Sequence, residues 1–296
     1  MNAATNRPDQ TATANPCSLE GMVVPRRPLQ IISLGAGVQS STMALMAAAG
    51  EILPMPDAAI FADTQAEPQE VYRWLEWLKS HLPFPVHCVS KGSLTDVALT
   101  VRTKRDGSGK WAKTVVPTYI KNPDGSRGIV QRQCTYDFKV LELIKKSKQL
   151  LKELNAKTVV QWIGISLDEV HRMKESRDKK ITHRWPLVDA GMNRHDCLRW
   201  MAARNFPSPP RSACVYCPYH SDHEWRRLRT EHPDEFQKAV EFESRLQAVK
   251  RETDNMKGIP FLHASLRPLA SVDFSTEEER GQTNLFGNEC EGMCGV

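Results

Sequence analysis

The 296-residue sequence contains no apolar run long enough to cross a membrane and no apolar segment of the kind that secretory leaders carry. Its first 27 residues are polar and rich in Ala, Thr, Asn and Pro. We therefore expect a cytoplasmic protein that makes no membrane contact. Thiols stay reduced in that compartment, which favours metal binding or catalysis over disulfides for the eight cysteines. The absence of internal repeats excludes a repeat architecture.

Two common phosphate-binding signatures are also missing. No glycine-rich loop ends in Gly-Lys-Ser/Thr, which argues against a Walker loop. No third glycine is followed by a ribose-binding acid after the next strand, which argues against a dinucleotide fold of the usual kind.

A different glycine loop is present between an apolar run at 29–32 and a helix-prone stretch at 42–49. It reads Ser33-Leu34-Gly35-Ala36-Gly37-Val38-Gln39-Ser40-Ser41. A strand, a glycine turn and a helix N-terminus expose backbone N–H groups to a phosphate. We expect positive φ angles at Gly35 and Gly37, and capping or hydroxyl contacts from Ser40 and Ser41.

An acidic residue follows the next predicted strand. Residues 58–62 read as a buried strand, and Asp63 stands at its carboxyl end. Carboxyl ends of neighbouring parallel strands share one edge of the sheet. Asp63 is therefore predicted to hold a ribose or a magnesium ion beside the glycine loop.

These features resemble the phosphoadenosine phosphosulfate (PAPS) reductase family of the adenine nucleotide alpha hydrolase-like, ATP-pyrophosphatase (PP-loop) superfamily. The family loop usually reads Ser-Gly-Gly-x-Asp-Ser, and residues 35–40 match it with Gln39 in place of the aspartate. The resemblance continues at 132–135 with Lys139, at 162–166 with Arg172, and at 214–218. It implies an adenine nucleotide, ATP or PAPS, held by Ser33, Gly35, Ala36, Gly37, Gln39, Ser40, Ser41, Asp63, Gly164 and Ser166. Lys139 and Arg172 would stabilise developing negative charge.

The cysteines include one clear ligand pair, Cys214 and Cys217, in a Cys-x-x-Cys followed by Pro218. A tight turn lets both thiolates reach one metal, and such sites suit zinc or an iron-sulfur cluster. The resemblance implies a 4Fe-4S cluster with Cys134 as a further ligand. The fourth position is open among Cys197, Cys290, Cys294 and no protein ligand. Cys88, in an apolar run, is expected in the core.

The C-terminal tail allows three interpretations of Cys290, which follows Glu289 in a glycine-bearing segment. It is a metal ligand, a mobile catalytic nucleophile or part of an exposed tail. Neighbouring acids would raise rather than lower the pKa of its thiol, which counts against an activated nucleophile.

The order of predicted elements is typical of an α/β protein. Strands and helices alternate from residue 29 to about 165, which predicts a Rossmann-like α/β/α sandwich with a parallel sheet. We expect a disordered tail at 1–28, a nucleotide-binding domain at 29–190, and a helical region with the Cys-x-x-Cys and the cysteine tail at 191–296.

A polar insertion at 91–133 interrupts that alternation. It carries nine basic residues against three acidic ones, a net charge of 9 − 3 = +6. The basic residues are Lys91, Arg102, Lys104, Arg105, Lys110, Lys113, Lys121, Arg127 and Arg132. A lid over phosphates, a nucleic-acid contact and a solvated loop are the three interpretations.

Three functions follow from these motifs. The first is ATP-dependent, adenylating sulfur transfer to a nucleic acid or a small acceptor, with sulfur from a persulfide such as that of a cysteine desulfurase. The second is reduction of PAPS or adenosine phosphosulfate to sulfite with thioredoxin, which Gln39 favours because such an enzyme needs no pyrophosphate-bound magnesium. The third is a nucleotide-sensing subunit without turnover.

Overall fold

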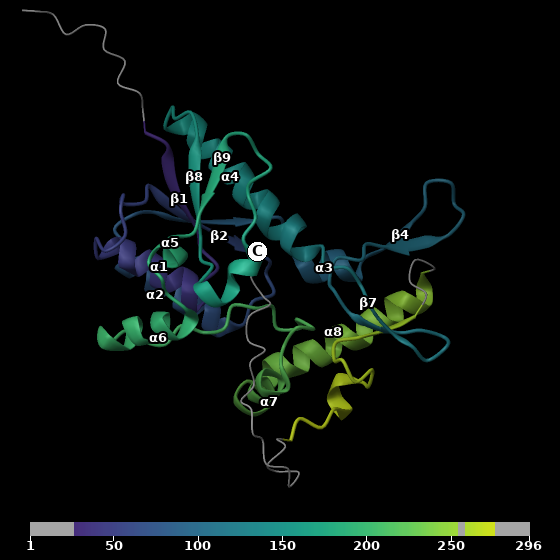
Figure 1. Ribbon diagram of the computed structural model, residues 1–296. Helices are drawn as coiled ribbons and strands as arrows, with labels where there is room; N and C mark the ends of the chain where they lie inside the picture. The colour runs from purple at the N-terminus through teal and green to yellow at the C-terminus, as the bar shows by residue number, and fades with distance from the viewer. Residues whose placement is uncertain (1–26, 254–257, 276–296) are drawn as a thin grey trace, which may run out of the picture.

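A five-stranded parallel sheet organises the larger part of the protein (Figure 1). The computed structural model describes residues 27–253 and 258–275. The strands lie in the order β3-β2-β1-β8-β9, and all neighbouring pairs are parallel. Their bounds are β1 (Leu29–Ser33), β2 (Ala58–Asp63), β3 (Val86–Ser90), β8 (Val159–Ile163) and β9 (Ile181–Arg184). The predicted parallel sheet is confirmed.

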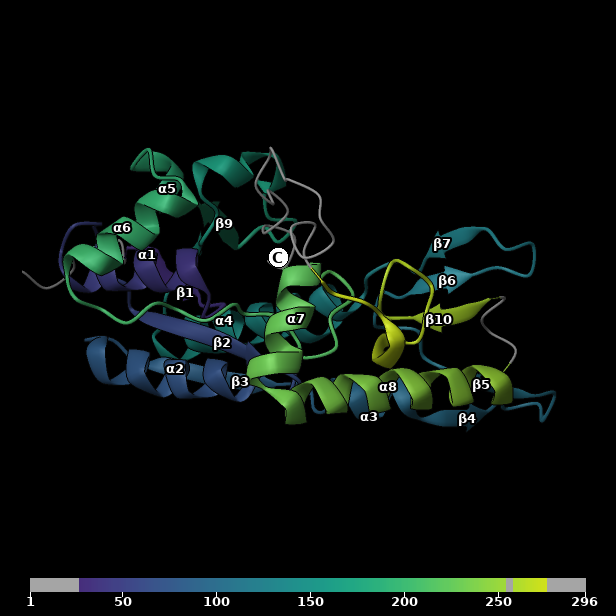
Figure 2. The same cartoon turned by 90° about the horizontal axis from the view of Figure 1, so that it is seen from below.

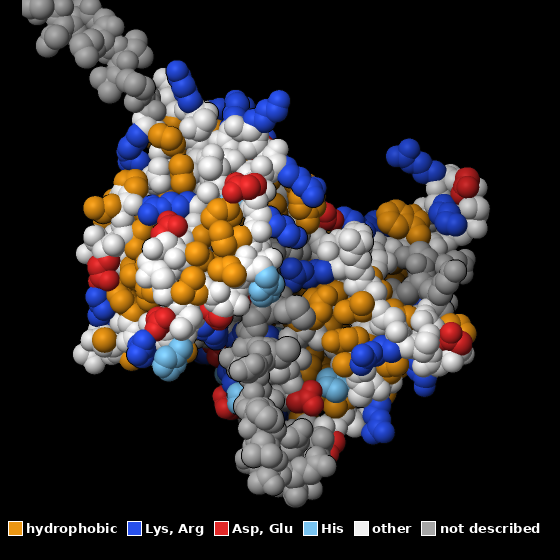
Figure 3. Space-filling model, viewed as in Figure 1, with side chains coloured by type: hydrophobic (Ala, Val, Ile, Leu, Met, Phe, Trp, Pro, Cys, Tyr) orange, Lys and Arg blue, Asp and Glu red, His pale blue; other side chains and the backbone are white. Residues whose placement is uncertain are grey.

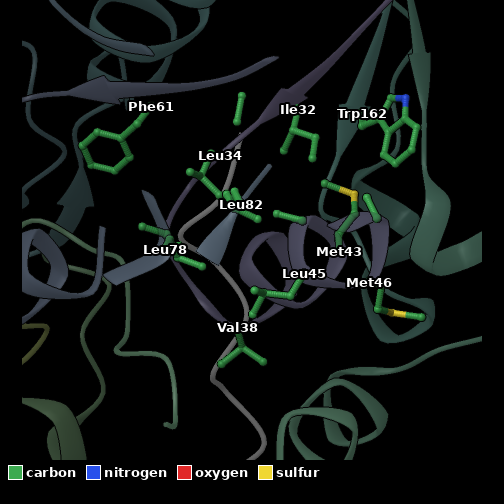
Figure 4. Close-up of a cluster of buried hydrophobic side chains, with 14 of the residues drawn as sticks. Ile32, Leu34, Val38, Met43, Leu45, Met46, Phe61, Leu78, Leu82 and Trp162 are labelled. Carbon is green, nitrogen blue, oxygen red and sulfur yellow. The ribbon is translucent and has the colours of Figure 1, made fainter. Parts of the chain in front are cut away.

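Helices cover both faces of this sheet because successive strand residues point into two different cores. On β1, Ile32 belongs to the core on one face, whereas Ile31 belongs to the core on the other. The first face, shown in Figure 4, packs against α1 (Val38–Ala48), α2 (Gln69–His81), α5 (Pro186–Asp189) and α6 (Arg194–Ala203). The second face packs against α4 (Leu141–Glu153). The result is the predicted Rossmann-like α/β/α sandwich, the sheet module.

A second module has its own core and lies beside the sheet module (Figure 2). Its helices are α3 (Leu94–Leu99), α7 (Asp222–Glu231) and α8 (Pro233–Glu252), with a short turn η3 (Leu269–Ser271). Its strands are β4 (Val101–Thr103), β5 (Lys110–Ala112), β6 (Tyr119–Lys121), β7 (Arg127–Ile129) and β10 (Ile259–Phe261).

The basic insertion folds together with the C-terminal region. Strand β6 pairs with β7 and, antiparallel, with β10 from the other end of the chain. Val115 and Val116 are buried in the same core as Phe242 of α8. The insertion is therefore anchored at its base, and the β4–β5 hairpin extends from the body as an arm (Figure 1).

Polar side chains cap the N-termini of two helices. The Asn193 side chain accepts from the Asp196 amide, and the Asp196 carboxylate accepts from the Asn193 amide, which completes a capping box for α6. Ser221 caps α7 with one bond, since its hydroxyl accepts from the Glu224 amide over 3.3 Å. Among the described residues, no helix combines the length and the apolar character that a bilayer span requires.

The prediction that Cys88 lies in the core is wrong. Cys88 is exposed on β3. Since β3 is an edge strand with a neighbour on one side only, its side chains are covered less completely than those of β1 or β2.

Candidate functional site

A cavity of about 210 Å³ opens at the carboxyl edge of the parallel sheet. Its floor is the segment 33–40, where β1 passes into α1, together with the ends of β2 and β8. Its walls come from the start of the helix that leads into α4, from η2 (Leu167–Arg172), from residues 210–212 and from the first turn of α7. Parallel sheets of this kind place ligands at this edge.

The glycine loop brings the N-terminus of α1 to the cavity. Gly35, Gly37, Gln39 and Ser40 line it, and the Gly35 amide donates to the Ser40 hydroxyl over 3.1 Å. The first N–H groups of a helix have no intrahelical acceptor and carry the positive end of the helix dipole. This end of α1 therefore favours an anion such as a phosphate.

The expected positive φ at Gly35 and Gly37 is wrong. The left-handed residue of the loop is Ala36, with φ +57°, and Gly37 is extended with φ −98° and ψ −175°. Ala36 is fully buried. The turn needs one left-handed residue, and that conformation falls between the two glycines.

Gly164 lets the end of β8 approach the loop closely. A Cβ at this position would stand 2.9 Å from both the Cα and the backbone nitrogen of Ser40. Backbone atoms cannot give way as a flexible side chain does, so only glycine fits here. Gly164 therefore acts by positioning the loop, and it also lines the cavity.

Three other predicted nucleotide residues face elsewhere. The Ser41 hydroxyl accepts from the Trp74 indole over 2.9 Å inside the core. Asp63 accepts from the Tyr72 hydroxyl (2.8 Å) and from the Gln65 amide (2.7 Å), and it does not line the cavity, although Phe61 and Ala62 do. Ser166 is buried beneath the loop.

Four basic side chains surround the cavity. Lys139 and Arg172, both predicted from the sequence, line it, and so do Arg194 and Arg211, which the sequence reasoning missed. Two acids line the same cavity, Glu169 and Glu224.

Each of the two acids is paired with a guanidinium. Glu169 Oε1 lies 2.5 Å from Arg172 Nη1, and Glu224 Oε1 lies 2.9 Å from Arg227 Nη2. Burial raises the pKa of Glu169, and the Arg172 charge opposes that shift. The lining carries four basic and two acidic residues, 4 − 2 = +2 in net charge, and this balance suits a polyanion.

Lys139 connects the cavity to a buried set of polar groups. Its Nζ lies 2.9 Å from Oε1 of Glu67, whose side chain is fully buried. Burial by itself lowers the pKa of Lys139, but the Glu67 charge and the nearby Cys214 and Cys134 thiols outweigh it, so the pKa is raised. Lys139 therefore stays cationic at neutral pH.

Cys134 and Cys214 lie near this lysine. The Cys214 sulfur is 3.4 Å from the Thr64 hydroxyl. Burial raises the pKa of Cys214, Glu67 adds to the shift, and Lys139 opposes it. The turn that holds the predicted ligand pair is closed by the Cys217 amide, which donates to the Cys214 carbonyl over 2.9 Å.

The described residues do not form a complete metal site. Within residues 27–253 and 258–275, no three His, Cys, Asp or Glu side chains are grouped so that they could hold a metal ion. Cys197 is buried in the core between the sheet and α1, apart from the other two thiols. Cys290 and Cys294 lie outside the described residues. The thiols of Cys134 and Cys214 near Lys139 are of the type that soft metals bind. The cysteines among the described residues, however, do not form the ligand set of a 4Fe-4S cluster.

Three acids at this edge of the sheet already have protein partners. Asp63 accepts from Tyr72 and Gln65 through Oδ1, and the carboxylates of Glu169 and Glu224 each face an arginine. Magnesium prefers oxygen ligands in octahedral geometry, usually one or two carboxylates beside substrate phosphates.

No protein-family model matches the chain, and no curated protein sequence matches it. Among solved structures it is similar to the PAPS reductase of Candida auris in its phosphate complex, with TM-score 0.36 and 14% identity over 63% of this chain and 78% of the other. It is also similar to the U34-tRNA thiolase NcsA of Methanococcus maripaludis with its 4Fe-4S cluster, with TM-score 0.37 and 14% identity over 85% and 83%.

Proposed function

We propose that the protein is a nucleotide-binding enzyme of sulfur chemistry, most consistent with ATP-dependent, adenylating sulfur transfer. One observation carries the proposal. The N-terminus of α1 and four basic side chains surround one cavity, and Lys139 of that cavity lies beside the Cys134 and Cys214 thiols. An anion-binding site near thiols suits a reaction with two stages. In the first, a nucleotide phosphate activates an oxygen of the acceptor, and in the second, sulfur replaces that oxygen.

The first step of the proposed reaction is adenylation. An acceptor oxygen attacks the α-phosphorus of ATP, the bond to the bridging oxygen breaks, and pyrophosphate leaves with that electron pair. The loop amides at the start of α1, together with Arg172 and Arg211, line the cavity and would stabilise the negative charge that develops on the leaving group. Lys139, held in place by Glu67, would stabilise the adenylated intermediate.

The second step replaces the activated oxygen with sulfur. A persulfide sulfur attacks the acceptor carbon, and AMP leaves with the C–O electron pair. A second thiol then attacks the donor sulfur and breaks the S–S bond. The transferred sulfur stays on the acceptor, and the donor thiol and the second thiol are left joined as a disulfide. The persulfide would come from a partner such as a cysteine desulfurase. The 4Fe-4S cluster stays a prediction for the full chain, and no step is assigned to it.

A nucleic acid is the acceptor that the insertion favours. The β4–β5 arm carries Arg102, Lys104 and Arg105 against Asp106, and its Lys110 is paired with Glu252 of α8 at 2.6 Å. Figure 3 shows basic side chains gathered at its end. Arg102 lies over the ring of Trp111, 5.3 Å from its centroid, and Trp111 is 37% exposed. Exposed aromatic and guanidinium planes stack on unpaired bases, and lysines bind phosphates.

The insertion is less suited to be a lid. None of its described residues lines the cavity, and its base is fixed by the pairing of β6 with β10. The arm therefore extends away from the cavity, where it would contact a large acceptor rather than cover a small one.

Anaerobic turnover assays test the proposed reaction class. The protein is purified without oxygen, assayed for iron and sulfide, and incubated separately with ATP and with PAPS while pyrophosphate and sulfite are followed. Pyrophosphate release that requires an acceptor and a sulfur donor supports sulfur transfer. Sulfite formation with thioredoxin contradicts it and supports the reductase.

Two lysines of one continuous helix give a matched pair of variants for this assay. Lys139→Gln removes the charge that faces the cavity and pairs with buried Glu67, and it should slow turnover by about 100-fold. Lys145→Gln removes a lysine that is 65% exposed and paired only locally with Glu142, so turnover should stay unchanged. Equal rates in the two variants would contradict the role of Lys139.

The arm is tested by binding rather than by turnover. Fluorescence anisotropy with a labelled RNA stem-loop should show weaker binding for Lys104→Ala/Arg105→Ala. The slope of log affinity against log salt should fall by roughly two for the two lost phosphate contacts. Lys179→Ala/Lys180→Ala removes equal charge from the β8–β9 connection and serves as the control. Equal losses in both double variants would refute a specific role for the arm.

PAPS reduction is the second candidate, and one contact favours it. Gln39 Oε1 accepts from Arg194 Nη1 over 3.3 Å, so a neutral amide meets a guanidinium where the family loop carries an acid. A phosphosulfate needs no magnesium for its chemistry. The nucleophile of this reaction would be Cys290 or Cys294, and both lie outside the described residues.

A further inference from the structure

Two aromatic side chains differ from the others in their exposure. Among the described residues, Tyr136 and Trp111 are the large aromatic residues that are exposed, at 57% and 37%. Tyrosine and tryptophan are enriched at interfaces because they combine an apolar ring with a polar atom. Trp111 belongs to strand β5 of the arm, whereas Tyr136 belongs to η1 (Thr135–Val140), the π-helical turn that leads into α4.

Tyr136 lies beside the cavity of the candidate site. Thr135 and Lys139 of the same turn line this cavity, and Tyr136 is the exposed residue between them in the chain. π-helical turns are frequently found at functional sites. A ligand that extends from the cavity past Thr135 into solvent can therefore contact the Tyr136 ring.

An ion pair joins the arm to this turn. Lys113 follows β5, two residues after Trp111, and its Nζ lies 2.5 Å from Oδ2 of Asp137, the neighbour of Tyr136. The pair balances the charge of the acid that stands next to the exposed ring. Trp111 and Tyr136 are therefore held at the two ends of one short connection between the arm and the cavity.

Basic side chains accompany the exposed ring. Arg132, just before the turn, lies over the ring of Tyr219, 5.8 Å from its centroid. Arg211 of the cavity donates to the Tyr219 carbonyl over 3.1 Å, and Lys139 lines the cavity on the same turn as Tyr136. Proteins that bind single-stranded nucleic acids combine such positive charge, which follows the phosphates, with aromatic rings on which the bases stack.

We propose that Tyr136 stacks on an unpaired base of the nucleic-acid acceptor and holds it beside the cavity, while the arm binds the neighbouring backbone. The proposal deepens the proposed function and rests on it in one respect, that the acceptor is a nucleic acid. Its consequence is a preference for one class of acceptor. Unpaired bases offer their faces to an aromatic ring, whereas the bases of a duplex are already stacked on their neighbours. The site therefore takes a loop, a bulge or a single strand rather than a regular duplex.

RNA binding by the full-length protein tests this proposal. The probes are a labelled single-stranded RNA of mixed sequence and the fully paired duplex of the same strand, and fluorescence anisotropy gives both affinities. Tyr136→Ala should bind the single strand about tenfold more weakly, because one stacked base is lost. The same variant should bind the duplex within about twofold of the unsubstituted protein, because no base of the duplex is free to stack.

Two further substitutions at this position separate stacking from apolar packing. Tyr136→Phe keeps the aromatic face and should bind the single strand within about twofold of the unsubstituted protein. Tyr136→Leu keeps apolar bulk without an aromatic face and should bind as weakly as Tyr136→Ala. A 2-aminopurine base in the single strand reports the contact directly, since stacking quenches its fluorescence. We expect quenching by the unsubstituted protein and by Tyr136→Phe, and a smaller effect with Tyr136→Leu.

Leu154→Ala is the control for this series. Leu154 lies at the other end of α4 and is 48% exposed, so its loss should leave the binding of both probes unchanged. Melting curves of all variants verify that they are folded.

Three results would overturn the proposal. If Tyr136→Ala binds the single strand as tightly as the unsubstituted protein, the ring makes no contact with the acceptor. Equal losses for the single strand and the duplex would mean that the residue does not act by stacking on unpaired bases. If the unsubstituted protein binds neither probe, the nucleic-acid acceptor fails as well, and a separate titration with ATP shows whether the nucleotide site stands.

Discussion

Gly164 shows how one absent side chain sets the geometry of the phosphate loop. A Cβ there would lie 2.9 Å from the Ser40 backbone, so Gly164→Ala must displace either β8 or the loop. Overpacking of this kind costs about 1–3 kcal/mol of stability. We expect a lower melting temperature and at least tenfold weaker nucleotide binding.

Gly128→Ala is a suitable control for that substitution, because its nearest contact would be an ordinary 3.6 Å from Asn122. The melting temperature and the nucleotide affinity of both variants are the quantities to measure. A Gly164→Ala protein that binds nucleotide normally would show that the close approach of β8 is not required.

Glu243 gives the protein a stability that depends on pH. Burial raises the pKa of Glu243 to about 7, and the amides of Leu269 and Leu262 offset the shift only in part. In the unfolded chain this carboxyl ionises near pH 4.5, so between about pH 4.5 and pH 7 the unfolded state releases a proton that the folded state keeps. The contribution of Glu243 to stability is present below this window and is lost as the pH rises through it, by roughly 3 kcal/mol.

Urea unfolding at about pH 5 and about pH 8 measures this effect. The Glu243→Gln variant has no such proton to lose, so its stability should change less between the two pH values than that of the unsubstituted protein. Identical pH dependence in the two proteins would mean that Glu243 is ionised throughout.

At the scale of single residues, the sequence predicted the segment that forms the loop but not the conformation of each residue. Gly35 and Gly37 mark a turn, yet the left-handed conformation falls on Ala36, since the direction of the chain on both sides decides it. Arg194 could have been found from the Asn193 cap that starts α6 at the sheet edge. Arg211 carries no local signal, because only the packing of the second module brings it to the cavity.

The capping box of α6 links an element boundary to the site. Asn193 and Asp196 satisfy each other's amides, and the next residue after Asn193 is Arg194. Replacing an N-cap asparagine with alanine costs about 1 kcal/mol.

Asn193→Ala should therefore lower stability by about that amount and weaken nucleotide binding a few-fold, because the first turn of α6 frays. Ser221→Ala removes a comparable cap from α7 and is the matched comparison for stability. Urea unfolding and nucleotide titration of the two variants measure these effects. If Asn193→Ala loses stability but keeps its affinity for the nucleotide, the cap does not contribute to the site.

At the scale of elements, the alternation of strands and helices was sufficient to predict the parallel sheet. It did not predict how the insertion at 91–133 folds. The helix that precedes β8 begins at Thr135, and its first part, Thr135–Val140, is π-helical. Lys139 lies in that part, and π-helical turns often mark functional sites. The pairing of β6 with β10 joins segments almost 140 residues apart, and no local pattern can reveal such a partner.

The two modules are joined by charged pairs as well as by packing. Arg227 of α7 lies 2.5 Å from Glu70 of α2 and 2.9 Å from Glu224, and its side chain is 20% exposed. Hydrogen bonds to Glu224 and Glu70 raise the pKa of Arg227. Removing one partner of such a pair leaves the others buried and uncompensated.

Arg227→Met should lower the free energy of unfolding by about 2–4 kcal/mol, as measured in urea. Adding Glu70→Gln to that variant should recover part of the loss, because one orphaned charge is then removed. An additive loss in the double variant would mean that the two residues act independently and that this contact does not join the modules.

For the molecule as a whole, the central claim is that the N-terminus of α1 holds the phosphates of an adenine nucleotide. Hydrogen exchange of the backbone amides, with and without ATP or PAPS, tests it most directly. We expect slower exchange at residues 35–40 and 164–166 when the nucleotide is present, since the first amides of α1 then gain an acceptor. Unchanged exchange in these segments, or protection confined to other parts of the chain, would contradict it.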